Sequence, residues 1–421
     1  MRLGGQDVSD QPRITASLQF QFGTHFTQVH LWTGDCARIL EERMTAVHDH
    51  VLVADRATAG FAGIEAGDTR SNAAAPGEAT DAPAPNAAAA NAAEAGGRAE
   101  RRDAAVILPS GERAKEWESV SEILHLAVER RLGRDGTILG LGGGVVCDVS
   151  AFAASTYMRG CRLQLIPTTL LAMADAALGG KTGVNFAGYK NMVGTFYPAQ
   201  HIHIVPSTLQ SLPEREYHSG LAEVIKSAML GDGKLLELLE THQDEVGARD
   251  PEVVREMVQR SLSVKGSIVE RDFTEEGVRA YLNLGHTFAH ALEALSNFAD
   301  YTHGEAVAWG LAQALRLGRA EGLTDSVYAD RLEKLLDDYG FVTELPDLDW
   351  DALFAAMQQD KKKQRGTVRF VLQEGLAATE LRAVPLERVR ETLAGAPSGP
   401  YSAPSSDARS SGAPSSGAHS S

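Results

Sequence analysis

The sequence predicts an α/β protein, with an N-terminal α/β domain built on a mostly parallel sheet and a C-terminal domain that is mostly helical. Three observations lead to this prediction. The chain has 421 residues, which is long for a single hydrophobic core. Strand-like and helix-like segments alternate as far as about residue 210, as parallel sheets with crossover helices require. Beyond Leu212-Pro213, helical periodicity dominates.

Short apolar runs in the first half predict the strands, at residues 28–32, 50–55, 104–109, 136–141 and 162–167. Helical spacing of apolar residues predicts helices over 117–132 and 145–157. Residues 66–102 consist mainly of Ala, Pro, Gly, Asn and Glu and cannot bury enough apolar surface to offset their ordering entropy, so we expect a disordered insertion there.

In the second half, apolar residues recur at helical spacing in six segments, at residues 220–230, 235–242, 251–270, 278–295, 305–321 and 328–339. Residues 368–373 predict one late strand, and the Ser-, Gly- and Pro-rich residues 396–421 predict a disordered tail. We therefore expect domains at 1–210 and 211–395, followed by this tail.

Composition and charge exclude several classes of partner. Fifty-six acidic residues against 40 basic residues give a formal net charge of -16, which repels nucleic acids and anionic membranes. We find no secretory signal and no run of the ~20 apolar residues that a membrane span needs. Three cysteines without paired spacing argue against a disulfide framework and favour a cytoplasmic protein.

Two glycine-rich turns are candidate anion sites. Gly142-Gly143-Gly144 lies between a predicted strand and a predicted helix, where backbone N–H groups can approach a phosphate, although glycine also serves packing in tight turns. Gly179-Gly180-Lys181-Thr182 resembles the end of a P-loop, but Asp175 replaces its first glycine, so a Walker site is not expected. Lys181 either meets an anion or is solvated.

Polar residues in the helical half form two further candidate sites. Arg279, Asn283, His286 and His290 have spacings of four, three and four, which predicts one polar face of a single helix. Such a face is either solvated or a site for metal binding and proton transfer. Glu223 and Lys226 are three residues apart. They form either an ordinary intrahelical ion pair or part of a site in which the Glu223 carboxylate is a metal ligand. His303 opens the next predicted helix, and one Glu with two His would leave Zn2+ an open position.

Eight stretches, in this order along the chain, together resemble the 3-dehydroquinate synthase family: residues 142–148, 154–160, 166–172, 175–182, 212–216, 221–226, 283–290 and 303–305. The resemblance implies a nucleotide-binding N-terminal domain, a helical domain for metal and substrate, and a homodimer. It implies a lyase that uses NAD and one divalent metal, Zn2+ or Co2+, to convert 3-deoxy-D-arabino-heptulosonate 7-phosphate. NAD oxidises one hydroxyl transiently, phosphate is eliminated, the ketone is reduced again, and an intramolecular aldol step closes the ring.

The resemblance also assigns roles to individual residues. It implies that the metal ligands are Glu223, His286 and His303, whereas spacing alone would pair His286 with His290. Substrate-contacting positions are Asp175, Lys181, Asn191, Lys226, Lys265, Arg279, Asn283, His290 and Lys361, with Arg159 supplied by the other subunit. NAD-contacting positions are Asp55, Glu112, Lys115, Gly143, Gly144, Asp148, Thr168, Thr169, Lys181 and Lys190. Without the resemblance, the Lys361–Lys363 charge run would be read as a solvated surface.

The chain departs from the family pattern at a few positions, and other functions remain as alternatives. Cys147 and Ala289 replace usual glycines, alanines follow Asp175 where serines are common, and Gly188-Tyr189 precedes Lys190 in an unusual loop. The alternatives are another sugar-phosphate cyclase, such as a 2-epi-5-epi-valiolone or 2-deoxy-scyllo-inosose synthase, a metal-dependent polyol dehydrogenase of related fold, or a binding module without activity. We find no ligand or phosphate-binding group missing, which disfavours the last.

Overall fold

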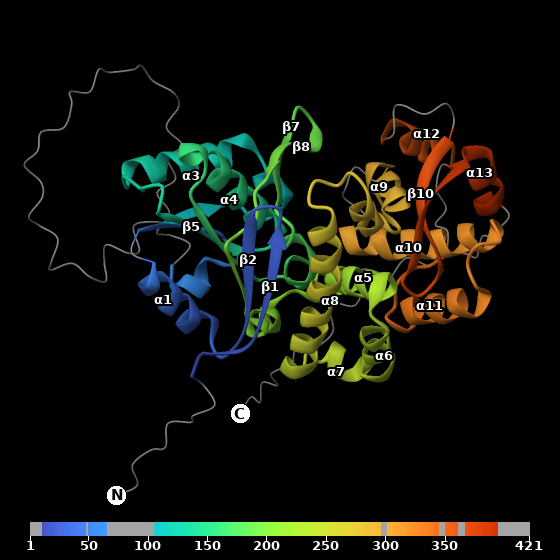
Figure 1. Ribbon diagram of the computed structural model, residues 1–421, viewed down its shortest axis with the longest axis horizontal. Helices are drawn as coiled ribbons and strands as arrows, with labels where there is room; N and C mark the ends of the chain where they lie inside the picture. The colour runs from blue at the N-terminus through green and yellow to red at the C-terminus, as the bar shows by residue number, and fades with distance from the viewer. Residues whose placement is uncertain are drawn as a thin grey trace, which may run out of the picture.

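The computed structural model describes residues 11–47, 49–64, 105–295, 301–344, 350–360 and 367–394. The predicted insertion, the predicted tail and Lys361 lie outside these residues. A half built on a β-sheet and a half built from helices lie side by side (Figure 1). The predicted α/β class with a helical C-terminal region is confirmed. In the described part of the chain, no helix is long and apolar enough to cross a membrane.

The first half is organised by a seven-stranded sheet of order β1-β2-β9-β6-β5-β3-β4. Only β1 runs antiparallel to its neighbour, so the sheet is mostly parallel as predicted. The strands are β1 (Arg13–Phe22), β2 (His25–Thr33), β3 (His50–Asp55), β4 (Ala105–Leu108), β5 (Thr137–Gly142), β6 (Arg162–Pro167) and β9 (His201–Ile204).

Helices cover both faces of this sheet because the buried strands alternate their side chains between two apolar layers. Val51 and Val53 of β3 face the main core with α3 (Trp117–Glu129) and α4 (Gly144–Thr156). Leu52 faces a second core with α1 (Cys36–Ala46). The predicted strands therefore read as continuous apolar runs, without polar alternation.

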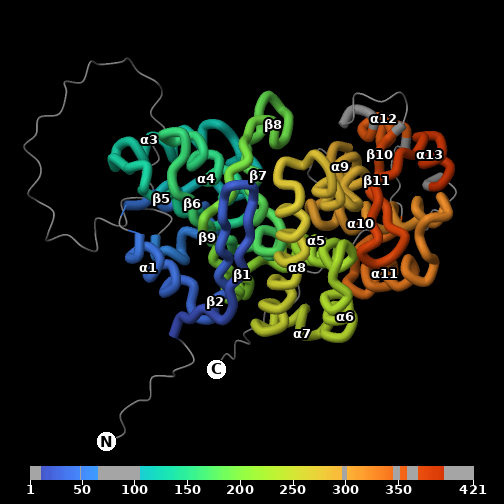
Figure 2. Tube along the Cα trace, in the orientation of Figure 1, coloured from blue at the N-terminus to red at the C-terminus, as the bar shows by residue number. Residues whose placement is uncertain are grey.

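The parallel strands bring their carboxyl ends to one edge of the sheet. Asp55 ends β3, Gly142 ends β5 and Thr168 follows β6, and Thr168 N–H donates to the Gly142 carbonyl at 3.0 Å. Ligands of open α/β sheets bind at this edge. Beyond it, a short hairpin of β7 (Lys181–Phe186) and β8 (Tyr189–Phe196) extends away from the sheet (Figure 2).

The second half consists mainly of helices, with one antiparallel pair of strands, β10 (Thr367–Gly375) and β11 (Ala378–Pro385). Its helices are α5 (Glu214–Gly231), α6 (Gly233–Thr241), α7 (Gln243–Gly247), α8 (Pro251–Arg271), α9 (His286–Leu295), α10 (His303–Ala320), α11 (Ser326–Asp338), α12 (Trp350–Asp360) and α13 (Leu386–Ala394). The late strand predicted at residues 368–373 therefore has a partner, β11, that the sequence analysis did not identify.

The prediction of one continuous helix over residues 278–295 was wrong. Residues Val278–Asn283 form a 3-10 helix, η7, and α9 begins only at His286. Leu284 is extended and Gly285 has a φ of 79°, a left-handed conformation that favours glycine. Arg279 and Asn283 therefore do not share a helix face with His286.

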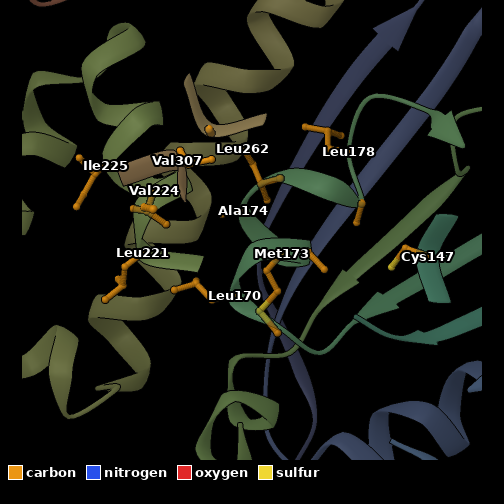
Figure 3. Close-up of a cluster of buried hydrophobic side chains, with 14 of the residues drawn as sticks. Cys147, Leu170, Met173, Ala174, Leu178, Leu221, Val224, Ile225, Leu262 and Val307 are labelled. Carbon is orange, nitrogen blue, oxygen red and sulfur yellow. The ribbon is translucent and has the colours of Figure 1, made fainter. Parts of the chain in front are cut away.

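The two halves share one hydrophobic core. Figure 3 shows Met173 and Ala174, from the segment after β6, beside Val224 of α5, Leu262 of α8 and Val307 of α10. All five side chains are fully buried, at 0% exposure. The apolar core is therefore continuous across the domain boundary expected near residue 210.

Two glycines let α10 approach its neighbours closely. A Cβ on Gly304 would lie 1.9 Å from the Ser219 carbonyl oxygen of α5, and a Cβ on Gly310 would lie 2.2 Å from the Gly285 carbonyl oxygen. Helix α10 is thereby held against the break that precedes α9. His286 and His303, the first residues of these two helices, are placed by this contact.

We expect Gly310→Ala to lower the free energy of unfolding by about 2 kcal/mol, because overpacking a close contact outweighs the gain in helix propensity. Thermal or chemical unfolding measures the change. Gly247→Ala is the matched control, since a Cβ at that helical position meets no atom within 4 Å. Equal stability of Gly310→Ala and the unmodified protein would contradict the close approach.

Candidate active site

Glu223, His286 and His303 converge from three helices on one point. Their ligand atoms lie within 4.8 Å of one another. Glu223 Oε1 is 3.1 Å from His303 Nε2 and 3.5 Å from His286 Nε2, and the carboxylate is fully buried. One carboxylate oxygen and two imidazole nitrogens suit Zn2+ or a similar divalent ion. The three predicted ligands thus form a donor set that fits a metal.

A contact made by the Nδ1 atom orients each imidazole ring so that its Nε2 atom faces Glu223. His286 Nδ1 lies 3.1 Å from the Leu284 carbonyl, which the break before α9 leaves outside helical hydrogen bonding. His303 Nδ1 lies 3.4 Å from Glu293 Oε1 of the same α9. Each acceptor favours the tautomer with the proton on Nδ1, which leaves Nε2 for a metal. The sequence analysis did not identify Glu293, since one acidic residue on a helix gives no signal of this contact.

The helix start fixes His303 in place. Thr302 caps α10, because its hydroxyl accepts from the Glu305 N–H at 3.2 Å and Glu305 Oε2 accepts from the Thr302 N–H at 2.7 Å. This capping box follows from the sequence pattern Thr-x-x-Glu. Ser219 Oγ also accepts from the Gly304 N–H at 2.9 Å, which ties the turn to α5.

The two histidines have opposite pKa shifts. Burial, reinforced by the charge of Lys226, lowers the pKa of His286 to about 3. Burial also lowers that of His303, but hydrogen bonds and charges from Glu223 and Glu293 outweigh it and raise the His303 pKa to about 9. Burial raises the pKa of Glu223, yet Lys226 and the two histidines hold it well below its usual range. Glu223 is therefore ionised, as a metal ligand must be.

A cluster of buried charges lies beside the triad. Lys226 Nζ is 2.5 Å from Glu223 Oε2, and Lys265 Nζ of α8 is 2.8 Å from Asp175 Oδ1 and 2.6 Å from the Asp175 carbonyl. Asp175 lies in a π-helical turn, Ala172–Ala176, a geometry that is frequent at functional sites. The pKa of Asp175 is raised by burial but lowered further by Lys265 and Lys226, so the carboxyl stays ionised.

Arg279 joins this cluster through the Gly179 turn. Its Nη2 donates to the Gly179 carbonyl at 2.9 Å and its Nη1 donates to the Phe273 carbonyl, while Nε has no protein partner among the described residues. A Cβ on Gly179 would lie 3.1 Å from Arg279 Nη2 and 3.6 Å from Lys265 Cε, so both cations border one turn. Asp272, which the sequence analysis did not identify, accepts from the Arg279 N–H at 2.8 Å and orders this segment.

Glu275, which the sequence analysis did not identify, contacts both Lys181 and Asn283. Lys181 Nζ forms an ion pair with Glu275 Oε2, and Asn283 Nδ2 donates to Glu275 Oε1 at 3.1 Å. Lys181 begins β7, directly after Gly179 and Gly180, so the segment is a turn into the hairpin and is followed by no helix. This agrees with the expectation that it is not a Walker site.

The second glycine turn lies at the carboxyl edge of the sheet. Gly143 caps α4, and a Cβ there would lie 3.1 Å from the Thr169 side chain. Lys115 Nζ is 2.6 Å from Oδ2 of Asp148, which lies on α4. Asp55 Oδ1 accepts from the Ala57 and Thr58 N–H groups, at 3.0 and 2.9 Å, and so orders its own turn. A narrow glycine turn at a helix N-terminus fits a pyrophosphate.

Cys147 does not obstruct this turn. It is 1% exposed, packs in the main core, and its Sγ lies 3.8 Å from the Gly142 carbonyl. Burial raises the pKa of the Cys147 thiol. Ala289 is likewise buried, in α9. Both departures from the family pattern are therefore accommodated within the core.

Several predicted site residues lie at the surface. His290 is exposed, and its ring centroid is 5.5 Å from that of His286. Lys190 and Asn191 are exposed on β8, and Glu112 is exposed before α3. Arg159 is exposed with a φ of 67°, and among the described residues no hydrogen bond or ion pair ties its side chain to the charge cluster. Thr168 is buried and Thr169 half-buried beside the glycine turn.

The fold and the site together define a class of protein: an α/β enzyme with a glycine turn at the sheet edge and a Glu-His-His site in an adjoining helical half. Comparison with known proteins is consistent with this class. Residues 105–219 match the family described as 3-dehydroquinate synthase N-terminal, and residues 220–363 match 3-dehydroquinate synthase C-terminal.

A relative from Acidithiobacillus ferrooxidans, described as 3-dehydroquinate synthase, is 44% identical over 289 residues, which cover 68% of this chain and 79% of that protein. A relative of the same description from Nitrosomonas europaea is 41% identical over 290 residues, covering 69% and 79%. The chain therefore belongs to the 3-dehydroquinate synthase family.

A solved structure confirms the fold. A 2-deoxy-scyllo-inosose synthase, complexed with carbaglucose-6-phosphate, NAD+ and Co2+, gives a TM-score of 0.72 at 21% identity, covering 90% of this chain and 99% of that one. At this identity the likeness concerns the fold alone.

If the triad holds the metal, His286→Ala should reduce bound divalent metal from about one per chain to below roughly a tenth, because two ligands bind far more weakly than three. Elemental analysis of the purified protein measures this. His242→Ala, at an exposed position outside the triad, is the control and should retain its metal. Full metal content and activity in His286→Ala would refute the assignment.

Proposed function

We propose that this member of the 3-dehydroquinate synthase family converts 3-deoxy-D-arabino-heptulosonate 7-phosphate into 3-dehydroquinate and phosphate. The observation that carries the proposal is the buried Glu223-His286-His303 set beside three buried cations, Lys226, Lys265 and Arg279. Lys226 pairs with Glu223 and Lys265 pairs with Asp175, while Arg279 Nε has no partner among the described residues. Three buried cations grouped at one site suit a substrate that carries a phosphate and a carboxylate.

Glu223, His286 and His303 would hold the divalent metal through one oxygen and two Nε2 atoms. When bound there, the metal supplies a Lewis acid that lowers the pKa of a substrate hydroxyl. Lys226, 2.5 Å from Glu223 and 2% exposed, keeps the carboxylate ionised and adds a positive charge next to that hydroxyl.

Residues of the sheet half would hold NAD, which supplies a hydride acceptor and donor when bound. The α4 N-terminus at Gly143 and Gly144 would receive the pyrophosphate. The remaining contacts would come from Asp55, Glu112, Lys115, Asp148, Thr168, Thr169, Lys181 and Lys190. Most of these residues lie at the carboxyl edge of the sheet or on the hairpin, where dinucleotides bind in related α/β folds.

Substrate binding would fall to the charge cluster and its neighbours. Lys265 and Arg279 would recognise the carboxylate, since both border the Gly179 turn and a guanidinium can bind a carboxylate through two parallel bonds. The phosphate and hydroxyl groups would meet Asp175, Lys181, Asn191, Lys226, Asn283, His290 and Lys361. Holding these groups in one geometry lets elimination and ring closure proceed on a single bound molecule.

We also propose a homodimer in which Arg159 serves the neighbouring site. Its exposure supports this, as does the lack of a bond between its side chain and the charge cluster among the described residues of its own chain. A cytoplasmic location is a further proposal, supported by three cysteines that are all buried and free.

The proposed reaction predicts phosphate release without net NADH, because the hydride returns to the same molecule. Purified protein with NAD+ and the heptulosonate phosphate is assayed for phosphate and for absorbance of reduced cofactor. NADH build-up in proportion to product would indicate a polyol dehydrogenase. Faster turnover of sedoheptulose 7-phosphate, which lacks the carboxylate, would instead indicate another sugar-phosphate cyclase.

Arg279→Gln should reduce kcat/KM on the heptulosonate phosphate by roughly 100-fold, because a hydrogen bond to a charged group contributes about 1.5–3 kcal/mol and its partner is left unpaired. Steady-state kinetics gives the value. Any residual turnover of sedoheptulose 7-phosphate provides the internal control. The loss of kcat/KM should be specific to the heptulosonate phosphate, because only that substrate carries the carboxylate. An equal loss on both substrates would show that Arg279 acts through structure and does not recognise the carboxylate.

A further inference from the structure

Asn185 lies at an irregularity of the β7–β8 hairpin. The register of the two strands shifts between Val184 and Phe186, so that Asn185 of β7 stands opposite residues 190–192 of β8 and the extra residues of the bulge lie in β8. Such a bulge bends its strand and changes the direction of the residues in it. The hairpin closes through Ala187 and Gly188, with φ of 52° and 81°, and this turn leads directly into the bulged part of β8, opposite Asn185.

The Asn185 side chain, opposite the bulge, joins two segments that carry proposed functional residues. Asn185 Nδ2 donates to Glu112 Oε1 at 2.9 Å, and Asn185 Oδ1 accepts from the Asn191 N–H at 2.9 Å. Asn191 has a φ of 52°, a left-handed conformation in which this bond fixes its direction. One amide thus contacts the proposed NAD segment with its donor and the proposed substrate segment with its acceptor.

The backbone of the same residue extends the link to the glycine turn. The Asn185 N–H donates to the Lys115 carbonyl at 2.8 Å, and Lys115 Nζ in turn pairs with Asp148 of α4 at 2.6 Å. A continuous chain of contacts therefore runs from the N-terminal part of α4 to the exposed hairpin. Figure 1 shows this hairpin standing between the sheet half and the helical half.

We propose that Asn185 is a positioning residue that holds the Glu112–Lys115 segment and the Asn191 segment in one arrangement, so that cofactor and substrate face each other. This inference rests on the proposed function for the roles of Glu112 and Asn191. Asn185 itself need not touch either ligand. Both of its side-chain hydrogen bonds are exposed to solvent, so each contributes modestly to stability, and their role is to fix the geometry of the two segments.

Asn185→Ala removes both bonds. We expect the dissociation constant for NAD+, measured alone by fluorescence titration, and the KM for the heptulosonate phosphate each to rise about five- to tenfold. Amide exchange of the 186–192 peptide, followed by mass spectrometry, should accelerate because the Asn191 N–H loses its acceptor. The thermal midpoint should stay within a few degrees of the unmodified value, as expected for a half-exposed polar residue.

Asn185→Asp separates the two bonds. The aspartate keeps an acceptor for the Asn191 N–H but places a like charge beside Glu112, so NAD+ affinity should fall about tenfold while hairpin exchange stays slow. In a Glu112→Gln background the glutamine can donate to the aspartate. Adding Asn185→Asp there should then change NAD+ affinity less than twofold, and this difference measures the coupling of the pair.

Thr195→Val is the matched control, because it removes the cross-strand Thr182–Thr195 hydroxyl contact elsewhere in the same hairpin and should leave NAD+ affinity unchanged. Unchanged NAD+ affinity and KM in Asn185→Ala would overturn the inference, as would equal effects of Asn185→Asp in both backgrounds. Failure of the unmodified protein to bind NAD+ would instead refute the proposed function on which the inference rests.

Discussion

The ionised, fully buried carboxylate of Glu223 is the group on which the site depends. A buried carboxylate is costly unless it is paired, and here Lys226 at 2.5 Å, His303 at 3.1 Å and His286 at 3.5 Å surround it. Each partner reaches Glu223 by a different route. Lys226 lies on the same helix, α5, one turn further along. His303 is positioned by the capped start of α10, and His286 is positioned by the break at Gly285.

The break at Gly285 connects packing to chemistry. It frees the Leu284 carbonyl to orient His286, and it makes room for α10, which approaches through Gly310. A continuous helix over the same residues would satisfy the Leu284 carbonyl internally and leave the imidazole without that acceptor. The local loss of helix therefore contributes directly to the direction in which the ligand points.

The hairpin of β7 and β8 connects the two halves of the proposed site in a comparable way. Lys181 at its start pairs with Glu275 of the helical half, and the ring of Phe196 at its end lies 5.5 Å from the Arg279 guanidinium carbon. Asn185, midway along the hairpin, donates to Glu112 of the proposed NAD segment. Because the hairpin itself has few buried side chains, these polar contacts determine its placement.

Much of the fold followed from the sequence, because apolar periodicity is a local property. The strands at residues 50–55 and 162–167 were predicted within a few residues, as were helices α3, α4, α6, α8, α10 and α11, whereas α1, α7, α12 and α13 were not predicted. Strand β1, the β7–β8 hairpin, β9 and β11 were missed, because short or exposed strands have weak patterns and form by pairing with distant residues. The three residues of the candidate metal set were likewise available from the sequence, through the family motifs.

Only the tertiary structure decided how these groups meet. Spacing in sequence suggested a pair of His286 and His290 on one helix, whereas the fold places His303 and Glu223, from two other helices, against His286. Asp272, Glu275, Glu293 and Asn185 were invisible to pattern reading, since each acts through a contact between segments that no periodicity encodes. The sequence by itself determined the elements and the chemical groups, and long-range packing determined their directions, because side-chain orientation depends on neighbours that only folding brings together.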